Sequence, residues 1–147
     1  MGLKPERLAA GAAFALDTVV FVYFLEQHPV HYPAAEGLFR RMEAGDISGV
    51  MSSLVFTELL VPAYRAGDVE RAETLIHLLT HFPHLEVKPL SVEISAEAAR
   101  LRAASGMRTP DAIHAATAMK AGASAIITND KAFLRLSESI DILLLDV

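Results

Sequence analysis

The 147-residue sequence contains no cysteine and no tryptophan, and only 7% of its residues are aromatic. The lack of cysteine excludes disulfides, thiolate catalysis and cysteine-ligated zinc or iron–sulfur sites. No apolar run approaches the ~20 residues of a membrane-spanning helix, so the sequence predicts no membrane span. An excess of positive charge is also missing, and the net charge of −5 argues against a broad basic surface for nucleic acid.

Apolar residues are abundant instead, at 52% of the chain, with a mean hydropathy of +0.35. These values predict a large core and an oligomeric interface, and the length suits a single domain over residues 1–147. The apolar run before Asp17 superficially imitates a signal peptide, but it ends in this acid and leads into a strongly patterned segment. We therefore interpret the run as a first strand and expect a cytoplasmic protein.

Short apolar runs alternate with longer amphipathic segments, and no repeat or linker divides the chain. Strands are predicted at 14–17, 47–51, 85–90, 125–128 and 142–144. Helices are predicted at 18–26, 34–44, 54–64, 69–80, 95–104, 109–120 and 131–136. Apolar strands separated by helices indicate an α/β fold in which a parallel sheet is covered on both faces.

Local signals mark where several of these helices begin. The helix at 54–64 follows Ser52 and Ser53, either of which can cap it, and Pro62 should kink or end it. The helix at 69–80 follows Asp68, a plausible N-cap. The helix at 109–120 opens with Thr109 as N-cap, a proline at the first helical position and an acid in the first turn.

Four carboxylates stand out against the apolar background: Asp17, Glu58, Asp111 and Asp130. Burying an ionised carboxylate without a partner is costly. Asp17 and Asp130 each follow a predicted strand, and the carboxyl ends of parallel strands share the edge of a sheet where ligands bind. If the fold brings the four acids together, a divalent cation held by oxygen ligands resolves their mutual repulsion.

Each acid also has a purely structural explanation. Glu58 has apolar neighbours one helical turn away and could pair at the edge of the core with Arg65 or Arg102. The exposed N–H groups at a helix start would stabilise Asp111. The two aspartates at the strand ends could form turns or caps. The case for a site therefore rests on the four acids as a set.

Clustered carboxylate oxygens favour Mg²⁺ or Mn²⁺, ions that commonly share substrate phosphates. The matching reaction is hydrolysis of a phosphodiester bond, because a bound metal lowers the pKa of a water and stabilises charge on the leaving oxygen. The negative net charge is compatible with this reaction, since a metal site contributes acids to the count.

The segments around the acids resemble the PIN domain nucleases, and within them the VapC-type toxins of bacterial and archaeal toxin–antitoxin pairs. The resemblance covers about residues 12–146 and runs through FALDT at 14–18, SSLVFTEL at 52–59, TPDAIHAATA at 109–118 and ITND at 127–130. It implies a three-layer α/β/α sandwich with a mainly parallel sheet. It also implies a Mg²⁺- or Mn²⁺-dependent ribonuclease with the four acids at the metal site, a homodimer, and a small antitoxin that reaches into that site.

Two positions depart from the pattern of this family. Many relatives have asparagine two residues after the first aspartate, where this chain has Val19. Some carry another acid about one turn after the third, where His114 and Ala115 stand here. Neither departure removes one of the four acids, so we expect a competent site.

Three further residues are candidate supports of the site: Thr18, Ser53 and Asn129. Thr18 and Asn129 could orient carboxylates or bound waters, with turn formation as the alternative. Ser53 is interpreted first as a helix cap and second as a site residue. Three basic residues adjoin acidic motifs and are candidates either for phosphate contact or for a solvated surface: Arg65, Arg108 and Lys131.

The remaining histidines and aromatic residues carry weaker signals. His77 and His81 could share a helix face and bind a transition metal, but no adjacent glutamate supplies a base and Pro83 should end the helix before His84. His114 is interpreted as a packed histidine. Three aromatic residues of the first helix are expected in the core or a dimer interface, with base stacking as the alternative: Phe21, Tyr23 and Phe24.

The sequence therefore predicts a single-domain, metal-dependent endoribonuclease of the toxin type. The alternative is a PIN-like interaction module that keeps the acids but cleaves nothing. A metal-dependent phosphatase of small substrates is disfavoured, because its Asp-x-Asp signature is replaced by Asp17-Thr18-Val19.

Overall fold

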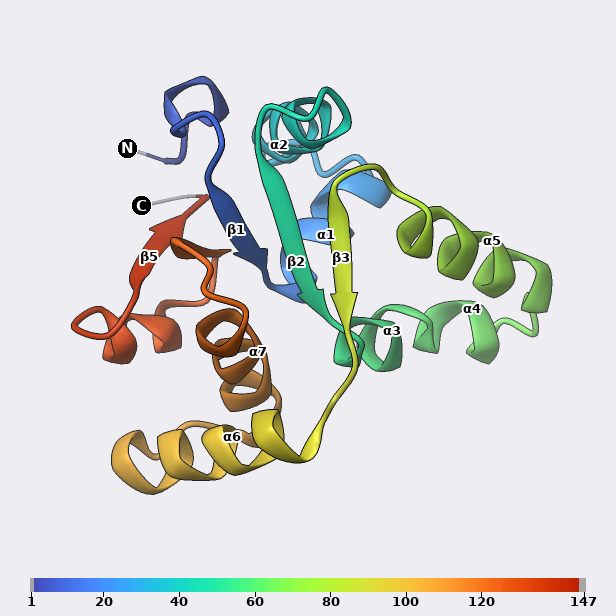
Figure 1. Cartoon of the computed structure of the whole chain (residues 1–147). Helices are drawn as coiled ribbons and strands as arrows, with labels where there is room; N and C mark the ends of the chain where they lie inside the picture. The colour runs from blue at the N-terminus through green and yellow to red at the C-terminus, as the bar shows by residue number, and fades with distance from the viewer. Residues whose placement is uncertain (1, 146–147) are drawn as a thin grey trace.

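A sheet of five strands forms the middle layer of the molecule (Figure 1). The structure is a computed structural model that describes residues 2–145, so Met1 and residues 146–147 of the predicted domain lie outside the described residues. The strands are β1 (Ala13–Leu16), β2 (Ser48–Ser52), β3 (Leu85–Lys88), β4 (Ala125–Thr128) and β5 (Asp141–Leu144). All neighbouring pairs are parallel, in the order β3-β2-β1-β4-β5. This sheet confirms the predicted fold class.

Helices cover both faces of the sheet. They are α1 (Thr18–Leu25), α2 (Tyr32–Glu43), α3 (Leu54–Leu59), α4 (Val61–Arg65), α5 (Val69–Thr80), α6 (Val92–Ser105) and α7 (Thr109–Lys120), with short 3-10 helices η1 (Pro5–Arg7) and η2 (Lys131–Leu136). Residues of α1, α2, α3 and α5 form the core on one face, and residues of α6 and α7 form the core on the other. The result is the expected three-layer α/β/α sandwich. None of the helices within residues 2–145 is both long and apolar enough to cross a membrane.

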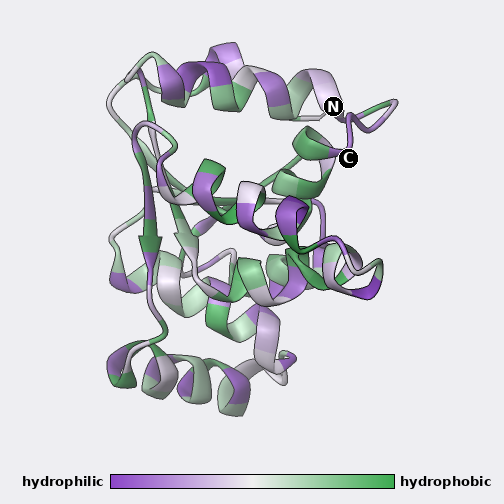
Figure 2. Cartoon of the chain, turned by 90° about the vertical axis from the view of Figure 1, so that its right-hand side faces the viewer, coloured by the Kyte–Doolittle hydropathy of each residue, from purple (hydrophilic) through white to green (hydrophobic). Residues whose placement is uncertain are grey.

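The inner strands β1, β2 and β4 are mostly apolar because both of their faces are buried, whereas the edge strands β3 and β5 also carry exposed charged residues. Phe14 and Leu16 of β1 pack on the side of α1 and α2, whereas Ala15 between them packs on the side of α7. This alternation is the period-two geometry of a strand. The outer helices show alternating hydrophobic and hydrophilic turns (Figure 2), as amphipathic segments on a buried sheet require.

Helix boundaries differ from the prediction in the segment that contains Glu58. The helix expected at 54–64 is two helices that meet at Leu60. Pro62 lies in the first turn of α4, where its missing N–H group has no intrahelical partner to lose. Proline therefore begins a second helix here and does not kink a single one. Elsewhere, α6 begins earlier than predicted because Oγ of Ser91 accepts the Ile94 N–H at 3.1 Å.

Two of the predicted caps need correction. The Asp68 side chain caps α5 as expected, accepting the Arg71 N–H at 3.0 Å. Ser53 occupies the N-cap position of α3 but makes no capping hydrogen bond with its side chain; Oγ of Ser52 accepts the Leu54 N–H instead, at 3.1 Å. For α7 the N-cap is Arg108, not Thr109, because the helical hydrogen bonds already begin at the Arg108 carbonyl.

Candidate functional site

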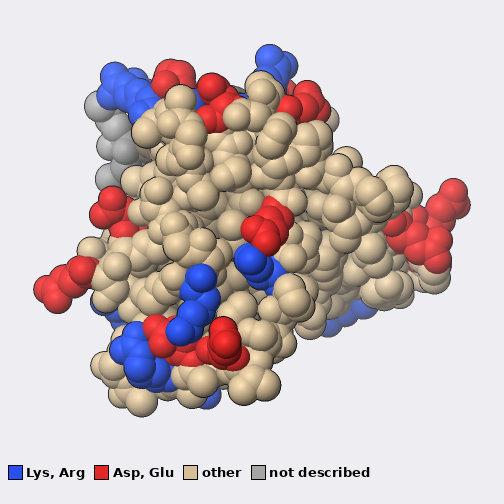
Figure 3. All heavy atoms as spheres, viewed as in Figure 1, with Lys and Arg blue, Asp and Glu red and all other residues tan. Residues whose placement is uncertain are grey.

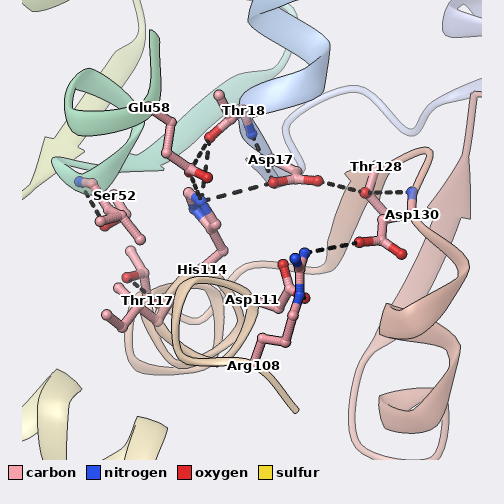
Figure 4. Close-up of polar contacts among 12 residues, drawn as sticks. Asp17, Thr18, Ser52, Glu58, Arg108, Asp111, His114, Thr117, Thr128 and Asp130 are labelled. Atoms are coloured by element: carbon pink, nitrogen blue, oxygen red, sulfur yellow. Dashed lines mark hydrogen bonds and ion pairs between the residues drawn. The ribbon is translucent and has the colours of Figure 1, made fainter. Parts of the chain in front are cut away.

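The carboxyl ends of the two adjacent strands β1 and β4 place Asp17 and Asp130 at one edge of the sheet (Figure 4). Asp17 caps α1, since its Oδ1 accepts the Thr18 N–H at 2.8 Å. Asp130 caps η2, since its Oδ1 accepts the Ala132 N–H at 2.9 Å. Capping and convergence are therefore not alternatives at these two positions, because both occur.

A buried hydroxyl connects these two aspartates. Thr128, the last residue of β4, donates from Oγ1 to Oδ2 of Asp17 at 2.7 Å and accepts the Asp130 N–H at 3.0 Å. Its side chain is fully buried. Sequence reasoning missed this residue, although a polar residue closing an otherwise apolar strand was a usable signal.

Glu58 reaches the same region from α3. Its Oε1 accepts a hydrogen bond from Oγ1 of Thr18 at 2.6 Å and lies 2.8 Å from Nε2 of His114. The alternative of a pair with Arg65 or Arg102 is wrong, because α3 turns Glu58 toward α1 and α7. Arg102 instead donates from Nε to a backbone carbonyl, that of Met107.

His114 lies one helical turn after Asp111 on α7 and is 5% exposed. It is packed, as predicted, but its Nε2 also lies 3.8 Å from Oδ1 of Asp17 and 3.3 Å from Oγ1 of Thr18. Its Nδ1 is buried without a hydrogen-bond partner among residues 2–145. The spacing from Asp111 was the signal that the sequence offered.

Asp111 completes the set from the first turn of α7, where it is 7% exposed. Nε of Arg108 donates to Oδ2 of Asp111 at 3.2 Å, and Nη2 of the same guanidinium lies 4.0 Å from Oδ2 of Asp130. The guanidinium therefore lies between two acids (Figure 4). The position of Asp111 also agrees with stabilisation by the helix start.

All four acids line one hollow of about 390 Å³. Its lining consists of Asp17, Thr18, Val19, Val22, Tyr23, Glu58, Arg108, Asp111, Asn129 and Asp130. Thr18 and Asn129, both predicted as supports, are included, whereas Ser53 is not. Asn129 donates from Nδ2 to the Tyr23 hydroxyl at 3.1 Å. Tyr23 therefore faces the hollow, while Phe21 is fully buried and Phe24 stacks on Phe39 in the core.

Burial and hydrogen bonding shift the pKa values of the buried Asp17 and the more exposed Glu58 in opposite directions. Burial raises the pKa of Asp17, against the lowering effects of His114, Thr128 and the Thr18 backbone. The hydrogen bond to His114 is the largest cause of the lowered pKa of Glu58. Burial therefore disfavours the ionised form of Asp17, and nearby positive charge does not offset this effect. The hydrogen bond from His114 favours the ionised form of Glu58.

The oxygen donors of the hollow suit a hard divalent cation, which would supply the positive charge that Asp17 lacks. Within residues 2–145, however, no three acidic or histidine side chains lie close enough together to enclose an ion. The donor chemistry fits, and the carboxylates would have to draw closer around the ion. On the face in Figure 3, acidic and basic residues lie in small mixed groups near the centre, toward the lower left and at the margins, and no continuous basic patch is visible.

Solved structures of toxin–antitoxin complexes share the fold of this chain. VapBC2 from Rickettsia felis, bound to a DNA fragment from its promoter, is 23% identical with a TM-score of 0.67, covering 91% of this chain and 99% of that chain. DNA-bound VapBC from Salmonella typhimurium is 21% identical with a TM-score of 0.68, and the match covers 90% of this chain and 98% of that chain. VapC20 from Mycobacterium tuberculosis, a toxin that cleaves the sarcin–ricin loop, is 15% identical with a TM-score of 0.61. The match covers 77% of this chain and 86% of that chain.

At the level of sequence, no curated protein matches the chain. The PIN domain profile does match, over residues 14–139. The matched segment contains the four acids and most of the sheet. The chain belongs to the PIN domain family.

Proposed function

We propose that this chain is a metal-dependent endoribonuclease that hydrolyses phosphodiester bonds in RNA. Asp17, Glu58, Asp111 and Asp130 would hold Mg²⁺ or Mn²⁺ and the attacking water. The observation that carries the proposal is the convergence of four acids, from four distant segments of a PIN domain, on one hollow. The RNA-cleaving activity of a structurally similar toxin supports the choice of substrate.

The residues around the acids have separate tasks in this proposal. Thr128 orients Asp17, while Thr18 and His114 hold Oε1 of Glu58 and leave its Oε2 without a hydrogen bond to the described residues. An ionised Oε2 is suited to orient a water or accept its proton. A bound divalent ion supplies Lewis acidity, lowering the pKa of a water and polarising the phosphoryl oxygen.

The decisive experiment is RNA cleavage by the purified chain with Mg²⁺ or Mn²⁺, and again after chelation. Asp17→Asn should lose more than the roughly 10–100-fold typical of changes to groups behind the metal ligands. Asp141→Asn, at an exposed position on β5, is the matched control and should cleave normally. Failure to cleave a broad panel of RNAs with metal present would favour the catalytically silent interaction module.

We also propose that the protein is the toxin of a toxin–antitoxin pair, a homodimer that acts in the cytoplasm and is inhibited by a small antitoxin. The VapBC complexes among the similar structures support this role. Expression of the chain alone should arrest growth, and co-expression of a short open reading frame beside its gene should relieve the arrest. Size-exclusion chromatography with light scattering tests the dimer.

A further inference from the structure

Arg108 is the single lysine or arginine among the residues that line the hollow, where it faces four carboxylates. It stands at the N-cap of α7, and its side chain is 76% exposed. The other two basic candidates from the sequence, Arg65 and Lys131, are not part of the lining. The mouth of the hollow therefore has one cationic side chain, and its position is defined by Asp111.

The guanidinium of Arg108 is held at one nitrogen and available at the other two. Of its five N–H donors, the one on Nε bonds Asp111. The distance of 4.0 Å from Nη2 to Asp130 is too long for a hydrogen bond. Within residues 2–145, the four donors on the two Nη groups thus make no hydrogen bond, although Asp111 fixes the plane in which they lie.

Electrostatics make this arrangement significant for a polyanionic substrate. An RNA strand that approaches four carboxylates is repelled unless positive charge lies at the entrance. Arginine is always protonated and can bind a phosphate through two parallel N–H···O bonds. The hydrogen bond to Asp111 raises the pKa of Arg108 still further.

We propose that Arg108 binds a phosphate group of the RNA at the mouth of the hollow through its two Nη groups, while Asp111 orients the guanidinium through Nε. This assignment rests on the proposed function in that it takes RNA as the ligand. It makes Asp111 a residue with two tasks, toward the metal and toward the substrate.

The test measures RNA binding by fluorescence anisotropy, with a labelled single-stranded RNA of random sequence as the probe. All variants carry Asp17→Asn, so that the probe stays intact. Arg108→Ala should weaken binding about 10-fold or more and reduce the salt dependence, as a log–log slope, by about 0.7. Arg108→Lys should keep that slope and recover part of the affinity. Arg65→Ala, at an exposed arginine outside the hollow, is the matched control and should change neither quantity.

Three results would overturn the assignment. One is an affinity and a salt slope that Arg108→Ala leaves unchanged, and another is an Asp17→Asn protein that does not bind the probe at low salt. The third is tighter Mn²⁺ binding by Arg108→Ala in calorimetry, together with unaltered RNA binding. That result would mean that the guanidinium only neutralises the acids when the metal is absent. An intact chain that binds RNA through Arg108 but cleaves none with metal present would refute the nuclease proposal and leave the phosphate contact standing.

Discussion

Nε2 of His114 lies 2.8 Å from Oε1 of Glu58, although 56 positions separate the two residues in the sequence. Thr18 donates to the same oxygen at 2.6 Å. A carboxylate on α3 is thus fixed by donors from α1 and α7, and it connects these three helices. The orientation of Glu58 depends on His114 as much as on its own helix.

Replacing His114 should therefore weaken metal binding without removing any acid. We expect His114→Ala to lower the affinity for Mn²⁺ about 10–100-fold in calorimetry, because Glu58 loses its buried donor. His114→Gln places an amide N–H near the position of Nε2 and should retain much of the affinity. His77→Ala, an exposed histidine on α5, serves as the control. An affinity that His114→Ala leaves intact would contradict the positioning role.

Neutralising Asp17 should stabilise the protein when no metal is present. Burial raises the pKa of this acid in the folded chain, so stability falls as the pH rises above the unfolded pKa, and the loss is complete above the folded pKa. Metal-free Asp17→Asn is expected to melt at a higher temperature than the wild type near pH 8, and the gap should close as the pH falls toward the usual aspartate pKa of about 3.9.

The same pair of proteins separates metal binding from fold stability. Mn²⁺ should raise the melting temperature of the wild type by mass action and have little effect on Asp17→Asn. Equal shifts in both proteins would argue that the ion binds elsewhere.

Glu58 should show the opposite dependence on pH. Its pKa is lowered in the folded chain, chiefly by the hydrogen bond to His114, so ionised Glu58 contributes stability above its unfolded pKa. That contribution is lost as the pH falls through the folded pKa. Glu58→Gln is expected to melt below the wild type near pH 7 and to match it in acid, once the pH has fallen below the lowered pKa of folded Glu58. Differential scanning fluorimetry across this range measures the difference in melting temperature between the two proteins, and a difference that stays constant at every pH would contradict the prediction.

The Thr128 hydroxyl should contribute more to the free energy of unfolding than its small size suggests. Thr128→Val keeps the shape of the side chain but leaves Oδ2 of Asp17 and the Asp130 N–H without their partner. We expect a loss of about 1–3 kcal/mol in urea unfolding for such buried groups. Thr128→Ser retains the hydroxyl and should lose less. A Thr128→Val protein as stable as the wild type would contradict the contribution of the hydroxyl.

Much of the fold was predictable because it depends on local pattern. The strand at 125–128 and the helix at 69–80 match the structure at both ends, since an apolar run or an N-cap such as Asp68 marks them within the sequence. Pro62 was predicted to kink or end the helix at 54–64, but the second helix that follows Leu60 was not predicted, because proline is compatible both with a helix end and with the first turn of a new helix. The predicted helix boundary was wrong where one residue type, here proline, is compatible with two local structures.

The acids of the site were predictable from the sequence, but the residues that form hydrogen bonds with them, His114 and Thr128, were not. Strand-end positions pointed to Asp17 and Asp130 directly. The alternative explanation of Glu58 named arginine as its partner, but the partner is His114, because the position of α3 beside α7 decides it and no local pattern encodes that position. Thr128 was missed for a similar reason, since its hydroxyl matters only once β4 lies beside β1.

The pairing of β1 with β4 also has a consequence for synthesis. Asp17 and Thr128 are joined across 111 positions of the chain, so β1, which can pair earlier with β2, gains β4 as its second neighbour only after residues 125–128 have been translated. A nascent chain that has emerged only as far as α6 holds Asp17 and Glu58 but lacks the segments that bring Asp111 and Asp130. Under the proposed nuclease function, the complete set of four acids can therefore form only after Asp130 has been translated.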